Sequence, residues 1–330
     1  MTATVQNSDF GPLIRVEDLS VVFPTRGATV QALDTVSIEI GRRERIGIVG
    51  ESGSGKSTLA LAMAGHIRGG GYRTVGRVVA AGLDLFAAQA SDLQSFRQDR
   101  LGFVFQNPIG TLDPTRRISR QFFENGHALP VDRIASLLEA VGLSDTARIL
   151  NCYPHELSGG MAQRVAIAMA IKHRPEIIIA DEPTSALDAS IRTQILRLLE
   201  EVSDETGAAL ILVSHDLRAV RSHCDRVAVM YGGRIVEFGK AADIFAAPLH
   251  PYTVALLGAM PGAEGYGGAI RPIQGNPPLL TMPASSCAFA DRCGKVQDKC
   301  RHVRPEPETC DGRSVTCHLL TAARHLELAR

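Results

Sequence analysis

Early in the chain the sequence reads Gly50-Glu51-Ser52-Gly53-Ser54-Gly55-Lys56-Ser57, a full match to the phosphate-loop pattern G-x-x-x-x-G-K-[ST]. A short apolar strand over 45–49 leads into this loop, and residues 56–66 follow with helical spacing and composition. Backbone N–H groups of such a loop, with the positive end of the helix, bind the β-phosphate of a nucleotide. We therefore expect Lys56 to bridge the β- and γ-phosphates and Ser57 to coordinate Mg²⁺, with Thr58 closing the nucleotide-binding stretch.

An acidic strand end follows far downstream, where the sequence reads Ile177-Ile178-Ile179-Ala180-Asp181-Glu182. The end of a sheet strand beside a phosphate loop is a suitable place for a residue that activates water. We expect Asp181 to act in the Mg²⁺ shell and Glu182 to polarise the water that attacks the γ-phosphate. The alternative is a strand that becomes polar only because it leaves the core.

The order of elements predicts an α/β fold with a largely parallel sheet. Strand-like runs lie at 176–180, 209–213 and 226–230, and an amphipathic helix is expected over 189–202. Residues 88–172 are expected to be mostly helical, and the glycines within 230–236 predict a hairpin. After about residue 246, prolines and glycines suggest irregular, tethered chain.

The composition limits the possible partners. Lys+Arg and Asp+Glu both number 35 among 330 residues, so no global field favours nucleic acid or an anionic membrane. There is no apolar run of the 18 or so residues that a membrane-spanning helix needs, and the first ten residues do not resemble a secretory signal. Any membrane role is therefore expected to require separate membrane subunits.

The chain resembles the ATP-binding cassette (ABC) ATPases in several further motifs. These are the signature Leu157-Ser158-Gly159-Gly160-Met161, the Q-loop residue Gln106, the D-loop Ser185-Ala186-Leu187-Asp188, the switch histidine His215 and the aromatic residue Phe23. The resemblance implies that Gln106 touches Mg²⁺ and the membrane partner, that His215 contacts the γ-phosphate and that Phe23 stacks on adenine. It also implies that Ser158, Gly159, Gly160 and Asp188 belong to the nucleotide-binding set.

The resemblance implies that the chain folds as a P-loop NTPase cassette. Its RecA-like core would carry an antiparallel β subdomain and a helical subdomain at about 88–172, all within residues 1–245, and a cysteine-rich extension would occupy 246–330. In this family the signature of one cassette closes on the ATP held by the phosphate loop of another. Two nucleotides are thus held between two cassettes, which separate after hydrolysis.

A narrower resemblance links the chain to the ATPases of dipeptide, oligopeptide and nickel importers, of the dipeptide-D/oligopeptide-D type. It rests on His250-Pro251-Tyr252-Thr253, on Tyr153-Pro154-His155-Glu156, on the opening stretch 16–25 and on the terminal cysteines. It implies an ATPase at the cytoplasmic face of the inner membrane that energises solute import. The implied partners are two permease subunits, a second ABC ATPase in a heterodimer or a homodimer, and an extracytoplasmic solute-binding protein, with no nucleic acid.

Five of the seven cysteines lie close together in the sequence near the C-terminal end. The family pattern matches Cys287, Cys293, Cys300 and Cys317. In some members the corresponding cysteines hold a [4Fe–4S] cluster, and four thiolates are the ligand set that such a cluster needs. Tetrahedral Zn²⁺ and free thiols are the alternatives, and the additional Cys310 leaves the fourth ligand open.

Two other functions remain open at this point. One is a soluble ABC ATPase without a transport role that acts on DNA or ribosomes, although the chain has neither a second cassette nor a long coiled-coil insertion, and its net charge is zero. The other, compatible with import, is a redox or iron sensor in which the cysteine region gates ATP hydrolysis.

Overall fold

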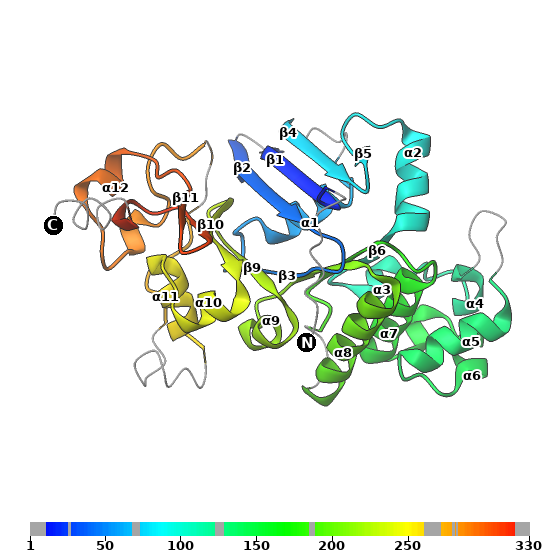
Figure 1. The fold of residues 1–330 in the computed structure, drawn as a ribbon. Coiled ribbons are helices and arrows are strands. Elements are labelled where there is room, and N and C mark those ends of the chain that lie inside the picture. The colour runs from blue at the N-terminus through cyan, green and yellow to red at the C-terminus, as the bar shows by residue number, and fades with distance from the viewer. Residues whose placement is uncertain are drawn as a thin grey trace, which may run out of the picture.

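The computed structural model describes residues 11–25, 28–67, 73–122, 129–184, 189–260, 272–278, 281 and 283–320. In these residues the strands form two sheets (Figure 1). The smaller sheet is antiparallel, with the strand order β2-β1-β4-β5. Its strands are β1 (Ile14–Thr25), β2 (Ala28–Ile40), β4 (Arg73–Ala80) and β5 (Leu83–Asp84).

The larger sheet has eight strands in the order β11-β12-β10-β9-β3-β8-β7-β6. Its strands are β3 (Arg45–Val49), β6 (Leu101–Val104), β7 (Ile177–Asp181), β8 (Ala209–Val213), β9 (Arg226–Tyr231), β10 (Arg234–Lys240), β11 (Glu308–Cys310) and β12 (Arg313–Val315). Pairing is parallel from β9 through β3, β8 and β7 to β6. The expected α/β class with a largely parallel sheet is confirmed, and the carboxyl ends of these five strands share one edge.

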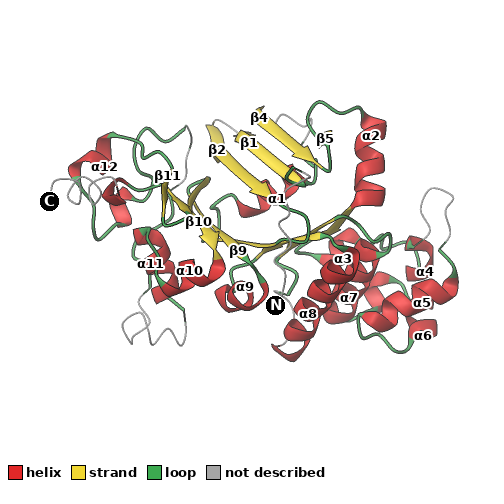
Figure 2. Ribbon diagram, in the orientation of Figure 1, coloured by secondary structure: helices red, strands yellow, loops and turns green. Residues whose placement is uncertain are grey.

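Helices lie around this sheet (Figure 2). They are α1 (Lys56–Met63), α2 (Ala90–Ser95), α3 (Pro108–Thr111), α4 (Ile118–Gln121), α5 (Val131–Ala140), α6 (Thr146–Asn151), α7 (Gly159–Ile171), α8 (Ala189–Thr206), α9 (Leu217–His223), α10 (Ala241–Ala246), α11 (Pro251–Gly258) and α12 (Asp298–His302). The segment 88–172 is mostly helical as expected, but it also contributes β6 to the edge of the large sheet.

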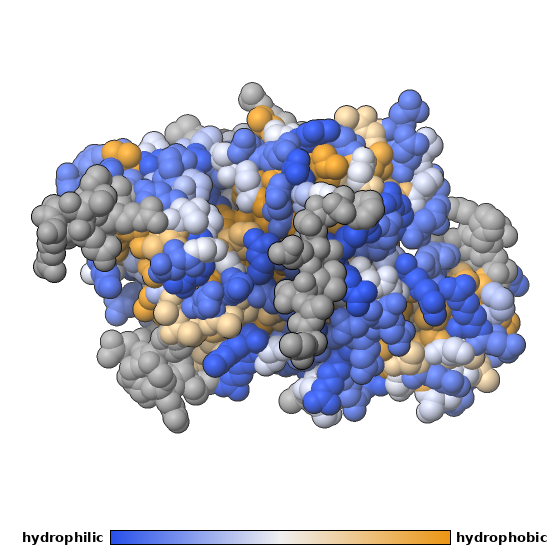
Figure 3. Space-filling view, viewed as in Figure 1, coloured by the Kyte–Doolittle hydropathy of each residue, from blue (hydrophilic) through white to orange (hydrophobic). Residues whose placement is uncertain are grey.

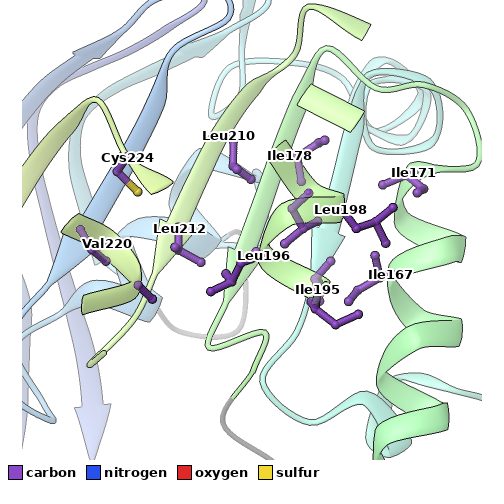
Figure 4. Close-up of a cluster of buried hydrophobic side chains, with 14 of the residues drawn as sticks. Ile167, Ile171, Ile178, Ile195, Leu196, Leu198, Leu210, Leu212, Val220 and Cys224 are labelled. Carbon is purple, nitrogen blue, oxygen red and sulfur yellow. The ribbon is translucent and has the colours of Figure 1, made fainter. Parts of the chain in front are cut away.

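Both faces of the large sheet are buried. Along β7, Ile177 and Ile179 face one apolar cluster, together with residues of the small sheet and α1. Ile178 faces the opposite cluster, which includes Ile167 of α7 and Ile195 of α8 (Figure 4). Strands covered on both faces are typically continuous apolar runs, as here. Each of these fully buried isoleucines contributes about 1.5–3 kcal/mol of transfer free energy, which makes the sheet a firm base for the loops at its edge.

The C-terminal region is more regular than its composition suggested. Strand β12 pairs with β10 through Glu237 and Phe238, and β11 pairs with β12, so this region extends the large sheet. Together with α11 and α12 it lies at the opposite end of the molecule from α4–α6 (Figure 1). The boundary predicted near residue 245 stays a prediction.

No helix within the described ranges has both the length and the apolar character needed to cross a membrane. Hydrophilic residues cover most of the face shown in Figure 3, with smaller apolar patches between them.

Candidate functional site

The phosphate loop joins β3 to α1 at the edge where the parallel strands end. Gly55 caps α1 with a φ of 100°, and a Cβ at this position would lie 2.5 Å from the carbonyl oxygen of Ala32. Only glycine fits such a conformation and such a close approach. The Ser54 side chain is buried, and within the described residues its Oγ has no hydrogen-bond partner. The loop is therefore a tight backbone cradle at a helix N-terminus.

Lys56 lies across this loop. Its buried Nζ donates hydrogen bonds to the carbonyl oxygens of Gly50 at 2.8 Å and Glu51 at 2.9 Å. Burial lowers the pKa of Lys56, and the nearby carboxylates, chiefly that of Glu182 and then that of Asp181, oppose the shift. The ammonium group is thus held beside the acidic strand end, in the position expected for a phosphate ligand.

Asp181 closes β7 next to Ser57. The carboxylate is buried, and its Oδ1 has no hydrogen-bond partner among the described residues. Burial raises the pKa of Asp181, while a hydrogen bond with the Ser57 side chain lowers it. A carboxylate oxygen without a partner, beside a hydroxyl group, matches the oxygen ligands that Mg²⁺ prefers. These two residues therefore fit the expected metal ion.

Glu182 and His215 form a pair at the ends of β7 and β8. His215 Nδ1 lies 2.7 Å from Glu182 Oε2, and the backbone N–H of Glu182 donates to the carbonyl oxygen of Val213 at 2.9 Å. Glu182 has a left-handed φ of 51°, an uncommon backbone conformation for a residue other than glycine. The His215 side chain is 69% exposed and that of Glu182 is 11% exposed, so the imidazole is open to solvent while the carboxylate is largely buried.

One pocket of about 500 Å³ collects most of the predicted residues. The predicted residues that line it are Phe23, Ser52, Gly53, Gly55, Lys56, Ser57, Thr58, Gln106, Glu182 and His215. They come from β1, from the phosphate loop with α1, and from the chain just after β6, β7 and β8. Residues that lie far apart in sequence thus surround a space of the size that small-molecule ligands occupy.

The signature residues lie elsewhere. Ser158 caps α7, and its Oγ accepts a hydrogen bond from the backbone N–H of Met161 at 3.3 Å. Ser158 and Gly159 are exposed, and neither they nor Gly160 line the pocket. Within one chain the structure therefore does not bring the signature to the phosphate loop. Asp188 lies outside the described residues.

The pocket also contains residues that the sequence did not single out as site residues. Gly232 and Gly233 of the hairpin turn line it, as do Gln31 of β2 and Pro278 of the C-terminal region. The expected hairpin is present, and both of its turn glycines have positive φ. No local pattern marks Pro278, because its role depends on where the chain returns in space.

Four C-terminal cysteines line a second, much smaller pocket of about 10 Å³, namely Cys287, Cys293, Cys300 and Cys317. Cys310 lies in β11 and does not line it. Burial raises the pKa of Cys287 and Cys293, and that of Cys317 to about 11, which favours neutral thiols. No group of three or more His, Cys, Asp or Glu side chains in the described part of the chain is placed to hold a metal ion. The expected iron–sulfur ligand cluster is thus not supported by the geometry.

Comparison with known proteins gives consistent matches. Residues 33–185 match the family model described as ABC transporter, and residues 236–300 match the model for the oligopeptide/dipeptide transporter C-terminal region. The oligopeptide transport ATP-binding protein OppD of Salmonella typhimurium is 38% identical over 323 residues, covering 96% of each chain. The dipeptide transport ATP-binding protein DppD of Bacillus subtilis is 39% identical over 319 residues, covering 93% of this chain and 94% of that protein.

A solved structure shows the same cassette fold. It is the dimeric post-hydrolysis state of the ATP-binding cassette MJ0796 bound to ADP and Pi. The two chains are 28% identical, with a TM-score of 0.62, and the match covers 69% of this chain and 98% of that chain.

Proposed function

The chain belongs to the ABC transporter family of ATPases, and we propose that it is the ATP-hydrolysing subunit of a membrane importer of peptides or a related solute. One observation carries this proposal: the phosphate loop, Gln106 and the Glu182–His215 pair share a pocket in a chain whose relatives at 38–39% identity are named for oligopeptide and dipeptide transport. The relatives favour import over the alternative of an ABC ATPase without a transport role.

ATP binding follows from the loop geometry. Backbone N–H groups at the start of α1 and the Lys56 ammonium would hold the phosphates, and Phe23 would pack on the adenine. Ser57 and Asp181 would hold Mg²⁺, which neutralises charge that develops on the phosphates. The loop N–H groups, the Lys56 ammonium and the bound Mg²⁺ would thus offset the negative charge of the polyphosphate.

Glu182 is the proposed general base for hydrolysis. Its carboxylate lies at the pocket wall, within hydrogen-bond distance of His215 and close enough to Lys56 to oppose the lowering of the lysine pKa. A base in this position accepts a proton from the attacking water as the bond to the γ-phosphorus forms, and ADP leaves. His215 orients the carboxylate and would contact the γ-phosphate.

A second cassette would complete the site. Because Ser158 and Gly159 are exposed and away from the pocket, the signature is free to close on a nucleotide held by another chain. The partner would be a different ATPase of the same system, or a second copy. Two permease subunits and an extracytoplasmic solute-binding protein would complete the importer, with this chain peripheral at the cytoplasmic face of the membrane.

A groove near Gln106 is the proposed contact with a permease subunit. It has a volume of about 330 Å³ and is lined by residues that include His66, Phe103, Phe105 and Met169. The ring centroids of Phe103 and Phe105 lie 4.2 Å apart, and the His66 ring packs edge-on against both. An aromatic groove beside the Q-loop would couple permease movement to the nucleotide site.

Phe105→Asp should lower co-purification of the permease subunits with this chain at least about tenfold, because the carboxylate would be desolvated in the groove. Nucleotide binding should persist, since Phe105 does not line the nucleotide pocket. The measurement is quantitative co-purification from solubilised membranes. Val131→Asp is the matched control, because Val131 is 61% exposed at the start of α5 and an acidic residue suits that position. An equal loss of permease co-purification in both variants would show that the groove is not the permease contact.

For the cysteine pocket we retain the [4Fe–4S] cluster as a proposal that rests on donor chemistry alone. Four cysteines that line one pocket supply the ligand type and number that such a cluster needs. Tetrahedral zinc and free thiols are the alternatives for the same four side chains.

Anaerobically purified protein should contain iron and acid-labile sulfide in equal amounts, with the absorbance of an iron–sulfur cluster. Cys300→Ser should lose both elements, whereas Cys310→Ser should keep them, because Cys310 lies outside the pocket. Zinc without sulfide would support the tetrahedral zinc site instead. The absence of all three elements would leave free thiols.

A further inference from the structure

Arg292 of the C-terminal region lies against the phosphate loop. It ends the short 3₁₀ turn Ala290–Arg292, and its guanidinium makes two parallel bonds to Glu51: Nη1 to Oε2 at 2.6 Å and Nη2 to Oε1 at 2.9 Å. The Arg292 side chain is only 6% exposed and that of Glu51 23%. A bidentate, largely desolvated pair of this kind fixes the orientation of both partners.

The same region also holds the backbone of Glu51. The Tyr252 hydroxyl accepts a hydrogen bond from the Glu51 N–H at 2.8 Å. Tyr231, whose hydroxyl lies 3.1 Å from Arg292 Nη1, packs with Tyr252 and Phe289, with ring centroids 4.5 and 5.2 Å from its own. The second residue of the phosphate loop is therefore held at both its main chain and its side chain by residues outside the loop.

Arg292 makes a further contact toward the nucleotide pocket. Its Nε donates to the carbonyl oxygen of Gln274 at 2.8 Å. Gln274 belongs to the segment 272–278, which ends at Pro278 in the wall of the pocket. Just beyond, the carbonyl oxygen of Thr281 accepts a hydrogen bond from Thr29 Oγ1 at 2.9 Å.

Thr29 lies next to the pocket residues Val30 and Phe23, which pair across β1 and β2. The segment that Arg292 holds therefore reaches the side of the pocket assigned to the adenine.

We propose that Arg292 is a positioning residue of the ATP site, which fixes the phosphate loop through Glu51 and holds the segment 272–278 so that Pro278 closes the pocket near Phe23. This inference rests on the proposed nucleotide site. It makes the C-terminal region a structural part of ATP binding. Lysine would keep the charge but could not make the two parallel bonds to Glu51 and the bond to Gln274 together.

The test is nucleotide affinity and steady-state kinetics of Arg292→Ala in the full chain. We expect the Kd of a fluorescent ATP analogue and the KM for ATP to rise about tenfold, with a much smaller change in kcat, because Arg292 acts through the loop. Arg292→Lys should recover only part of the affinity. The matched control is Arg301→Ala, which removes an exposed ion pair with Asp291 in the same region and should leave Kd unchanged.

A double-mutant cycle separates positioning from general stability. If Arg292 acts through Glu51, the variant carrying both Arg292→Ala and Glu51→Ala should bind nucleotide with about the affinity of the weaker single variant. Independent, additive losses would overturn the proposal. Pro278→Gly keeps Arg292 in place and should weaken nucleotide binding severalfold, so it tests the pocket segment even if Arg292→Ala fails to fold.

Failure of this inference and failure of the site itself give different results. Lys56→Ala should abolish nucleotide binding if the phosphate loop is the site. Loss of binding in Lys56→Ala with an unchanged Kd in both Arg292→Ala and Pro278→Gly would overturn the role of Arg292 and leave the site standing. Full binding by Lys56→Ala would overturn both.

Discussion

Glu182→Gln should lower steady-state ATP hydrolysis on the order of 100-fold or more, the scale seen when one transition-state group is removed. The amide has the shape of the carboxylate but cannot accept a proton from the attacking water. The Glu182 side chain is 11% exposed and its Oε2 lies 2.7 Å from His215, a contact that an amide oxygen can replace. The measurement is phosphate release under saturating Mg-ATP.

Nucleotide binding should survive this substitution, because Lys56 and the loop amides are unchanged. The backbone should survive too, since glutamine is no more strained than glutamate at a φ of 51°. Glu201→Gln on the exposed face of α8 is the matched control and should hydrolyse ATP at the parent rate. Parent-level turnover by Glu182→Gln would assign the base to another residue.

Glu182→Gln also tests whether ATP holds two cassettes together. If hydrolysis separates two cassettes, a variant that binds ATP without cleaving it should accumulate as an associated pair with its partner cassette. Sedimentation or light scattering with saturating Mg-ATP would show the larger species, and ADP should dissociate it. No association with any cassette, despite ATP binding, would argue against a nucleotide-held pair.

The local parts of the fold were predictable. The strand, loop and helix around Lys56 carry their own signals, since glycines at fixed spacing follow an apolar strand and precede a helical segment. Strand β6 was missed because Leu101–Val104 is a four-residue strand within a segment of helical pattern. Strands β11 and β12 have three residues each, and they form because β12 pairs with β10 and β11 pairs with β12, so no period of two could reveal them.

Some residues of the candidate site could be predicted from the sequence, and others could not. Lys56 and Asp181 could be proposed from motif and position, whereas Gln106, His215 and Phe23 were identified through resemblance to a family. Arg292 and Pro278 could not be found by either route. Arg292 lies 241 residues from Glu51 in sequence, and only the fold brings the two together. Contacts of this kind depend on tertiary packing, which single-sequence patterns do not encode.

Gly159→Asp should abolish most ATP hydrolysis, by about 100-fold, while leaving the fold and nucleotide binding by the isolated chain intact. A Cβ at Gly159 would meet nothing within 4 Å, so the packing of this chain does not require glycine there. An acidic residue in the first turn of α7 is favourable for helix stability. Loss of activity would therefore report on something outside the chain that approaches this residue.

The expected approaching group is the triphosphate bound by another cassette, which the new carboxylate would repel. Thermal unfolding and nucleotide titration should match the parent protein, and only turnover should fall. Gly159→Ala adds a methyl group without charge and should have a smaller effect. Parent-level turnover by Gly159→Asp would show that the signature does not contact nucleotide.

An experiment with mixed variants distinguishes a signature that contacts the nucleotide of another chain from one that contacts the nucleotide of its own chain. If two copies of this chain pair, a mixed dimer of Lys56→Ala and Gly159→Asp contains one site with both defects and one site with neither. Turnover should then reappear when the two inactive variants are combined, to at most about half the level of the parent dimer.

If the signature acted on its own chain's nucleotide, every site in the mixture would carry one defect and activity would stay lost. If the partner is a different cassette, mixing restores nothing, and Gly159→Asp instead disables the site built on that partner's phosphate loop. The N-terminus of α7 is exposed and does not line the nucleotide pocket of its own chain, which favours contact between chains.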